Sequence, residues 1–307
     1  MKLLFTSVLA VQVHSHGEFF KENYQINNLI GTYGYPDCTT TASKTELKWL
    51  SAEEASMKLT CPKKGGDGMI SIATVGDSIT AGACSSGGEN TYPARLQQNL
   101  DLKYPGAYSV TNLGACGSTM QKAADSPYWE RPQYDSLVAS EWDIVIIMLG
   151  TNDAKDEGSG GPTNWQHDCG AGGNATTTNC VFADDYKNMI NLVRTLGAPT
   201  IYTMTPIPLM QEGSIGANQT IINSLYPALL PLINADNEGV LGPIDLYTGF
   251  GGREDWQTYE QWPTSCTLDS DWDYCLNWCD AQNCDQCHPN DDGYAYMAKL
   301  VQQGLGL

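Results

Sequence analysis

From residue 69 onward, short apolar runs alternate with longer stretches whose apolar residues recur at helical spacing. The apolar runs predict five strands: Met69 to Val75, Tyr108 to Leu113, Asp143 to Leu149, Pro199 to Thr205 and Val240 to Leu246. The longer stretches predict helices at Tyr92 to Lys103, Tyr134 to Ser140, Ala183 to Leu196, Ala217 to Asn234 and Asp291 to Gln303. Strands separated by helices imply right-handed crossovers. We therefore expect an α/β fold in which helices cover both faces of a mostly parallel sheet.

The first strand leads directly into the run Gly76-Asp77-Ser78-Ile79-Thr80. Ser78 is therefore expected at the carboxyl end of a central strand, where open α/β sheets place their sites. A serine hydroxyl is a weak nucleophile unless a base accepts its proton, so a catalytic role for Ser78 requires a histidine elsewhere in the chain.

The sequence offers four histidines: His14, His16, His167 and His288. Asp285 stands three residues before His288. An aspartate at that spacing can hold the imidazole in the tautomer that presents its other nitrogen to a serine. The pattern predicts a triad of Ser78, His288 and Asp285, although a helix cap or a surface ion pair has the same Asp-x-x-His spacing.

Two further strand ends carry groups that can stabilise an oxyanion. Asn112 to Thr119 follows the second strand, and Gly150 to Asp153 follows the third. Because the carboxyl ends of parallel strands meet at one edge of a sheet, both segments are expected near Ser78. An acyl-transfer site needs such donors beside its nucleophile.

These segments resemble the four ordered sequence blocks of the SGNH hydrolases, also called GDSL esterases and lipases. The matching blocks are Gly-Asp-Ser-Ile-Thr, Asn-x-x-x-x-Gly-x-Thr, Gly-Thr-Asn-Asp and Asp-x-x-His-Pro-Asn, and the resemblance extends from Ile70 to about Gln303. It implies a three-layer α/β/α sandwich, the flavodoxin-like SGNH hydrolase fold, with a mostly parallel sheet of about five strands. It also implies a serine ester hydrolase that needs neither a metal nor an organic cofactor.

Carried over block by block, the resemblance makes Ser78 the nucleophile, His288 the base and Asp285 the residue that orients the base. For the oxyanion it implies three donors: the backbone amides of Ser78 and Gly117 and the side-chain amide of Asn152. Gly114 competes with Gly117 for this role, but Gly117 is the glycine followed by the x-Thr of the block.

Eleven cysteines favour an exported, disulfide-bonded protein, and their odd number leaves at least one thiol unpaired or paired to another molecule. Proximity in the sequence suggests the pairs Cys38 with Cys61 and Cys169 with Cys180.

A bridge from Cys84 to Cys116 is a further hypothesis, because it would brace the oxyanion loop. Bridges from Cys284 and Cys287 would similarly pin the loop that carries the base, although all of these cysteines would serve equally well to staple long loops.

The run Cys284-Asp-Gln-Cys287-His288 has two other interpretations. Cys-x-x-Cys-His is the attachment pattern of c-type haem, with His288 as an axial ligand to iron. A structural zinc ion is the second alternative, held by four thiolates: Cys275, Cys279, Cys284 and Cys287. Export into an oxidising compartment favours disulfides over zinc.

The opening MKLLFTSVLAVQVHS combines a lysine with an apolar run from Leu3 to Val13 and a small residue, Ser15, placed for cleavage. It predicts a secretory signal peptide over 1–15, the alternative being a buried N-terminal strand or helix.

The polar stretch 16–68 predicts an N-terminal extension packed on the core, and 69–307 predicts the hydrolase domain, with a Cys- and Trp-rich insertion at 253–287. No other segment approaches membrane-spanning length, so stable membrane insertion is not expected.

Two acceptor sequons, Asn174-Ala-Thr176 and Asn218-Gln-Thr220, predict N-linked glycans in a host with that machinery. The formal charge is −19, from 35 acidic and 16 basic residues. This charge repels phosphate backbones and anionic membrane surfaces, so nucleic acid is not an expected partner. The same charge also serves solubility outside the cell.

We therefore expect a secreted serine esterase that cleaves acyl esters through an acyl-enzyme, with a small-molecule or glycan ester as substrate and acetyl groups on carbohydrate as the favoured case. A lipase or lysophospholipase with the same machinery is the first alternative, and transfer to another alcohol stays open. A non-catalytic carbohydrate-binding protein is the alternative of another class. Its stacking surface would come from six aromatic residues: Trp256, Tyr259, Trp262, Trp272, Tyr274 and Trp278. Nothing in the sequence indicates an oligomeric state.

Overall fold

The structure is a computed structural model that describes residues 39–40, 59–60, 68–170, 175, 177–260, 262, 275, 277–278 and 285–307. The chain divides into two compact units, one of 1–63 with 305–307 and one of 64–304. In the first unit, strands β1 (Thr39–Thr40) and β2 (Leu59–Thr60) pair in antiparallel orientation. The predicted signal peptide, most of the predicted extension and the proposed Cys38–Cys61 bridge lie outside the described residues.

The second unit contains a five-stranded sheet in the order β4-β3-β5-β6-β7. Its strands are β3 (Ile70–Gly76), β4 (Tyr108–Gly114), β5 (Ile144–Met148), β6 (Thr200–Met204) and β7 (Val240–Ile244). All neighbouring pairs are parallel, which confirms the predicted mostly parallel sheet of about five strands. Every residue of β5 is buried, as expected for a central strand covered on both faces.

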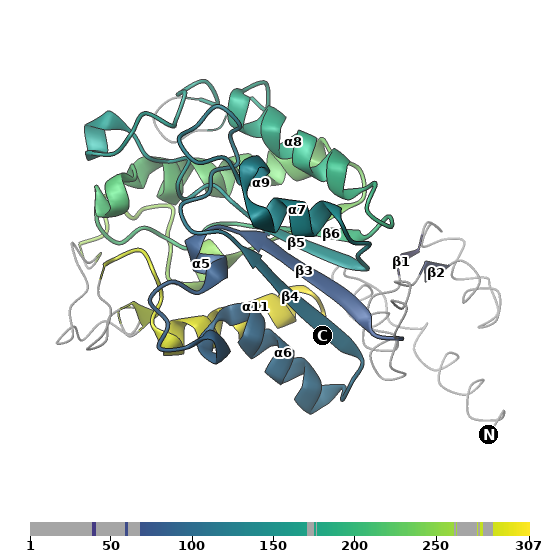
Figure 1. Ribbon diagram of the computed structural model, residues 1–307. Helices are drawn as coiled ribbons and strands as arrows, with labels where there is room; N and C mark the ends of the chain where they lie inside the picture. The colour runs from purple at the N-terminus through teal and green to yellow at the C-terminus, as the bar shows by residue number, and fades with distance from the viewer. Residues whose placement is uncertain are drawn as a thin grey trace, which may run out of the picture. The chain divides into compact units, whose positions relative to one another are not determined.

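Helices cover the sheet on both sides, which confirms the three-layer prediction (Figure 1). On one side lie α6 (Tyr92–Lys103) and α11 (Asp291–Gly304), which contact each other. On the other side lie α7 (Pro132–Val138), α8 (Val181–Val193) and α9 (Tyr226–Ala235). The short helical turns are α5 (Ser78–Ala81), α10 (Leu246–Gly249), η1 (Gly88–Asn90), η2 (Tyr128–Glu130), η3 (Glu157–Ser159), η4 (Ser214–Gly216) and the π-turn η5 (Ile221–Leu225).

The predicted helix from Ala217 to Asn234 starts later than expected and is not uniform. The side-chain oxygen of Asn218 accepts hydrogen bonds from the backbone N–H groups of Thr220 (2.9 Å) and Ile221 (3.3 Å), so Asn218 ends the preceding loop as a cap. Five residues of π geometry follow before α9 begins at Tyr226. The return to α geometry falls at Tyr226, next to Pro227, which has no N–H to donate.

The strand register brings the carboxyl ends of three neighbouring strands to one edge of the sheet. Gly76, the last residue of β3, pairs with Gly114 of β4 on one side and Met148 of β5 on the other. The segments that follow these strands therefore start next to one another. They are the three segments to which the sequence assigned the nucleophile and the oxyanion donors.

The predicted disulfide between Cys169 and Cys180 is present, with the two Cα atoms 4.9 Å apart. It ties Cys169 to the residue before α8, because Cys180 directly precedes Val181. Among the residues that the structure describes, no helix is both long and apolar enough to cross a membrane.

Candidate active site

Ser78 is the first residue of the one-turn helix α5, which begins immediately after β3. Asp77 caps this turn: its Oδ1 accepts a hydrogen bond of 2.9 Å from the backbone N–H of Ile79. N–H groups in the first turn of a helix have no acceptor within the helix. The strand-to-helix turn therefore holds the Ser78 side chain and its backbone amide at the sheet edge, with 9% of the residue exposed.

His288 links Ser78 to Asp285. Its Nε2 lies 2.7 Å from Ser78 Oγ, and its Nδ1 lies 2.6 Å from Asp285 Oδ2. In the tautomer protonated on Nδ1, the ring donates to the aspartate and accepts from the serine hydroxyl. The structure thus brings together three side chains that the sequence places up to 210 residues apart.

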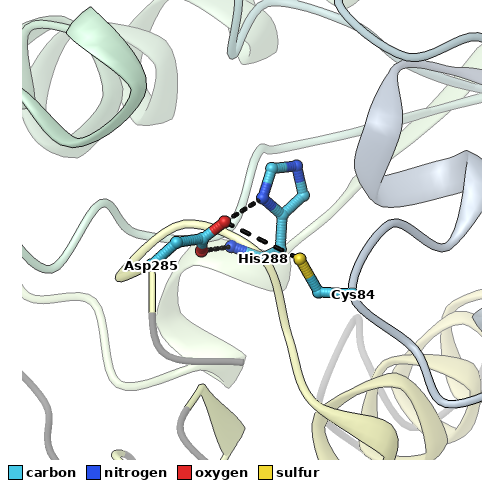
Figure 2. A group of neighbouring side chains, drawn as sticks. All are labelled: Cys84, Asp285 and His288. Atoms are coloured by element: carbon cyan, nitrogen blue, oxygen red, sulfur yellow. Dashed lines mark hydrogen bonds and ion pairs between the residues drawn. The ribbon is translucent and has the colours of Figure 1, made fainter. Parts of the chain in front are cut away.

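The Asp285 carboxylate is held by its own loop as well as by the imidazole (Figure 2). Its Oδ1 accepts hydrogen bonds from the backbone N–H groups of Cys287 (3.0 Å) and His288 (2.7 Å). The left-handed φ of 67° at Gln286 bends the chain so that both groups point back at the carboxylate. Burial raises the pKa of Asp285, but the hydrogen bond and positive charge offered by His288, together with the two backbone donors, outweigh burial and lower it.

Asn152 lies in the turn that follows β5, and it is 3% exposed. Its Nδ2 donates a hydrogen bond of 3.2 Å to the backbone oxygen of Ser118, in the segment that follows β4. The backbone oxygen of Asn152 accepts a bond of 2.9 Å from Asn164 Nδ2. The Asn152 amide is therefore held beside the loop that contains Gly117.

The two glycines that compete for the oxyanion role have different surroundings. A Cβ on Gly114 would lie 2.1 Å from the backbone nitrogen of Ala81, so only glycine allows β4 to approach α5 this closely. Gly117 has a left-handed φ of 79°, and a Cβ there would meet no atom closer than 3.8 Å. Gly114 is thus explained by packing, whereas Gly117 is explained by the bend of its loop.

Asp153 supports the loops that carry the candidate oxyanion donors, a role that its sequence pattern alone did not indicate. Its Oδ2 and Oδ1 accept hydrogen bonds from the backbone N–H groups of Met120 (2.8 Å) and Gln121 (2.7 Å). Burial raises the pKa of Asp153 to about 7 against the lowering effect of these two donors. The side chain ties the turn after β5 to the loop after β4. The one feature of the sequence that points to Asp153 is its position next to Asn152 in the Gly-Thr-Asn-Asp block.

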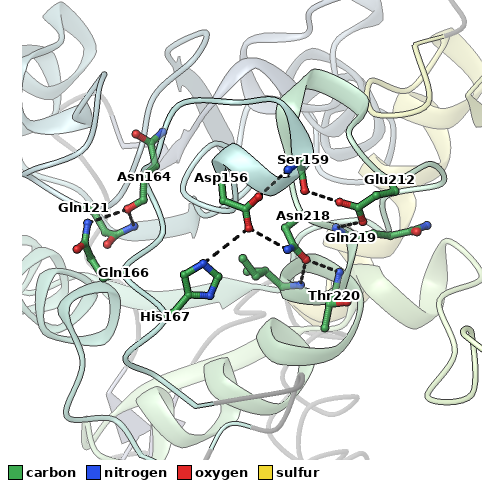
Figure 3. A network of polar contacts seen from close by, with 11 residues as sticks. Gln121, Asp156, Ser159, Asn164, Gln166, His167, Glu212, Asn218, Gln219 and Thr220 are labelled. Carbon is green, nitrogen blue, oxygen red and sulfur yellow. Dashed lines mark hydrogen bonds and ion pairs between the residues drawn. The ribbon is translucent and has the colours of Figure 1, made fainter.

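His167, another of the candidate bases, lies in a separate polar network (Figure 3). Its Nε2 is 3.7 Å from Asp156 Oδ2, which also accepts a hydrogen bond of 2.9 Å from Asn218 Nδ2. Of the histidines that the structure describes, His288 is the one in contact with Ser78. Asn218 belongs to one of the two predicted sequons, and Asn174 and Thr176 of the other lie outside the described residues. Glycosylation at either asparagine stays a prediction.

The predicted bridge between Cys84 and Cys116 is wrong, because the structure keeps the two residues as separate thiols. Cys84 instead directs its thiol at Asp285 Oδ2, 3.8 Å away. Cys287 is a buried thiol, so it does not pin the base-bearing loop through a disulfide, and the backbone hydrogen bonds to Asp285 hold that loop. Cys284 lies outside the described residues.

The four-thiolate zinc hypothesis is also wrong, since Cys275 is disulfide-bonded. The haem interpretation would make His288 an iron ligand, whereas the structure places its two ring nitrogens beside Asp285 and Ser78. Of the six aromatic residues considered for a stacking surface, Trp256 and Trp278 are buried. They pack inside the domain rather than presenting a ring face to a ligand, and Trp272 and Tyr274 lie outside the described residues.

Comparison with known proteins agrees with the fold and the sequence blocks. Over 99 residues, the chain is 36% identical to an acetylxylan esterase from Xylanibacter ruminicola. This alignment covers 32% of the chain and 18% of that relative, so the chain matches about a fifth of the relative's length. A solved structure of an acetyl xylan esterase, AlAXEase, is 18% identical with a TM-score of 0.50, over 76% of this chain and 98% of that one. At this identity the likeness shows the fold.

The sequence model of the GDSL-like Lipase/Acylhydrolase family matches residues 74–296. This range includes the strand that leads to Ser78, both candidate oxyanion segments, and the loop with Asp285 and His288. The chain therefore belongs to the GDSL-like lipase/acylhydrolase family.

Proposed function

We propose that the protein is a carboxylic ester hydrolase that uses Ser78 as its nucleophile, His288 as general base and Asp285 to orient the base. The observation that carries the proposal is the pair of contacts of 2.7 Å and 2.6 Å at the two nitrogens of His288. His288 removes the Ser78 proton as Oγ attacks the ester carbonyl, and the ring then gives that proton to the departing alcohol. Water, deprotonated by the same nitrogen, releases the acid and restores Ser78.

The tetrahedral intermediate places a negative charge on the former carbonyl oxygen. We assign its stabilisation to the backbone amides of Ser78 and Gly117 and to Nδ2 of Asn152. An amide nitrogen carries two hydrogens, and Ser118 accepts one of those on Asn152, so the second is available for the oxyanion. Donors fixed in advance stabilise developing charge without having to reorganise.

The proposed substrate is a short acyl ester, such as acetate, on carbohydrate. A cavity of about 360 Å³ adjoins the Asp285 loop, and polar residues dominate its lining: Gln211, Glu212, Ser214, Asp285 and Gln286, with Gly213 and Ile215. Amide and carboxylate groups suit the hydroxyls of a sugar better than they suit an acyl tail. Both relatives described above are named for activity on acetylated xylan, which supports the same class of substrate for this chain.

The decisive experiment compares p-nitrophenyl acetate with p-nitrophenyl palmitate, and acetylated xylan with a lysophospholipid, using wild type and Ser78→Ala. We expect faster cleavage of acetyl esters, release of acetate from the polysaccharide, and loss of activity on all substrates in Ser78→Ala. Faster cleavage of long chains would instead establish the lipase alternative. Residual activity in Ser78→Ala close to wild type would reject the assigned nucleophile.

We also propose that the protein is secreted and enters the secretory route through residues 1–15. The apolar run after Lys2 supports this, and so does the Cys169–Cys180 disulfide, since such bonds persist in oxidising compartments. N-terminal sequencing of protein recovered from culture medium should start at His16. Recovery of the whole chain inside the cell would contradict the proposal.

A further inference from the structure

Three side chains of types that ligate metal ions meet at the proposed active site (Figure 2). The Sγ atom of Cys84, a carboxylate oxygen of Asp285 and a ring nitrogen of His288 all lie within 4.8 Å of one another. Cys84 Sγ is 3.8 Å from Asp285 Oδ2, and the same oxygen is 2.6 Å from His288 Nδ1. The mechanism proposed above uses the aspartate and the histidine but gives the thiol no part.

We propose that Cys84, Asp285 and His288 form an inhibitory Zn²⁺ site that switches the esterase off. The inhibitory part of this inference rests on the proposed function, whereas the binding part does not. Thiolate, imidazole and carboxylate are the three side-chain types that bind zinc, and three such ligands leave a fourth tetrahedral position for water.

The side chains must adjust to accept the ion, and the distances show how. With Zn–S near 2.3 Å and Zn–O near 2.0 Å, tetrahedral coordination places sulfur and oxygen about 3.5 Å apart. The observed distance between Cys84 Sγ and Asp285 Oδ2 is 3.8 Å. The nitrogen and oxygen would lie about 3.3 Å apart, so the contact between His288 and Asp285 must open from its 2.6 Å. Asp285 Oδ1 stays on its backbone donors, and Oδ2 faces the ion.

The cluster is open to an ion from solvent. Cys84 is exposed, and the side chains of Asp285 and His288 are 36% and 12% exposed. The formal charge of −19 attracts cations to the protein as a whole, and the Asp285 carboxylate adds a local negative charge.

Metal binding at Nδ1 would stop the proposed reaction through the tautomer of His288. In the resting ring, Nδ1 carries the proton and Nε2 offers its lone pair to Ser78. A zinc ion takes the Nδ1 lone pair, so the one proton of the neutral ring moves to Nε2 through solvent. Ser78 then faces a donor instead of an acceptor. The Cys84 thiol releases its proton to solvent as it becomes a thiolate, so one proton is released for each ion bound.

The test compares zinc inhibition of p-nitrophenyl acetate hydrolysis in wild type, Cys84→Ser and Cys116→Ser. Each variant is scored against its own rate without metal. Cys116 is the matched control, because it is also an exposed thiol but does not belong to the cluster. Loss of a direct ligand in Cys84→Ser should raise the half-inhibitory Zn²⁺ concentration at least about tenfold, whereas Cys116→Ser should match wild type.

Chelation with EDTA should restore the wild-type rate, and Mg²⁺ at the same concentration should not inhibit, because it avoids thiolate and imidazole. Equal inhibition of wild type and Cys84→Ser would overturn the proposal, since the ion would then bind without the thiol.

Zn²⁺ binding is also measured independently of catalysis, in the Ser78→Ala protein. Calorimetry should give one Zn²⁺ per chain with release of one proton. In peptide maps of protein treated with maleimide, Zn²⁺ should protect Cys84 from labelling, whereas Cys116 should still react. Unprotected Cys84 would overturn the site. Protection of Cys84 in a protein whose wild-type form cleaves no ester would support the metal site and reject the proposed function alone, so the two failures are distinguishable.

Discussion

Asp285 holds His288 by both of its carboxylate oxygens: Oδ1 accepts the backbone N–H at 2.7 Å, and Oδ2 accepts from Nδ1 at 2.6 Å. One side chain therefore sets the position of the main chain that carries the imidazole and the orientation of the ring itself. The backbone contact means that the aspartate's contribution has a structural part and a chemical part. The two parts are separable by substitution.

Asp285→Asn should separate them. An asparagine oxygen can still accept the backbone N–H groups, but its NH₂ group faces Nδ1 and forces the proton onto Nε2. We expect a fall in kcat of roughly 10,000-fold with little change in thermal stability. Asp292→Asn, an exposed aspartate in the first turn of α11, should retain wild-type turnover as the matched control. Equal turnover in the two variants would contradict the role given to Asp285.

The rate should fall as the solution becomes acidic. His288 must be neutral to take the Ser78 proton, and a protonated imidazole has no lone pair left to accept it. The pKa of Asp285 is lowered by the hydrogen bonds it accepts, so this carboxylate keeps its charge to a lower pH than an ordinary aspartate and does not itself produce the fall in rate. A profile of kcat/KM for p-nitrophenyl acetate against pH should therefore show an acid limb with the slope of a single proton. A flat profile down to the pH of acid unfolding would exclude a histidine base.

Asn152→Ala should lower kcat and leave KM nearly unchanged. The amide is assigned to the oxyanion, which exists only in the transition state and the tetrahedral intermediate, so substrate binding does not depend on it. Loss of one such donor costs about 100- to 1,000-fold in kcat. Steady-state kinetics and a melting curve are needed together, because Asn152 also bonds Ser118. A raised KM with unchanged kcat would assign Asn152 to substrate binding.

Gly114 at the end of β4 and Gly117 in the loop after it should respond differently to alanine. In Gly114→Ala the new Cβ meets the backbone of α5, and overpacking of this kind costs about 3 kcal/mol or more of unfolding free energy. In Gly117→Ala the Cβ has space, so the cost is the strain of a left-handed φ, about 1 kcal/mol. Urea unfolding of the two variants measures both values. Equal losses would show that Gly114 is not required for the approach of β4 to α5.

Local patterns in the sequence predicted the order of the strands along the chain and the residues expected at their ends. Apolar runs of β-branched residues are local signals, and the run into Gly-Asp-Ser predicted that Ser78 follows a strand. Helix α8 was also predictable, because Tyr186, Met189, Ile190 and Val193 recur on one face and are all buried. The later start of the helix after Ala217 was not, since it depends on the hydrogen bonds of one side chain, Asn218.

Which groups come into contact depends on the packing of distant segments against one another. Whether Cys84 would pair with Cys116 or face Asp285 depends on distances between segments up to 201 residues apart, and no local pattern encodes such distances. The link from Asp153 to Met120 and Gln121 has the same origin. Local sequence sets the conformation of each segment, whereas contacts between segments arise from packing around the whole sheet. The sequence therefore named Ser78, Asp285 and His288 as candidates, and folding alone placed their side chains within hydrogen-bonding distance.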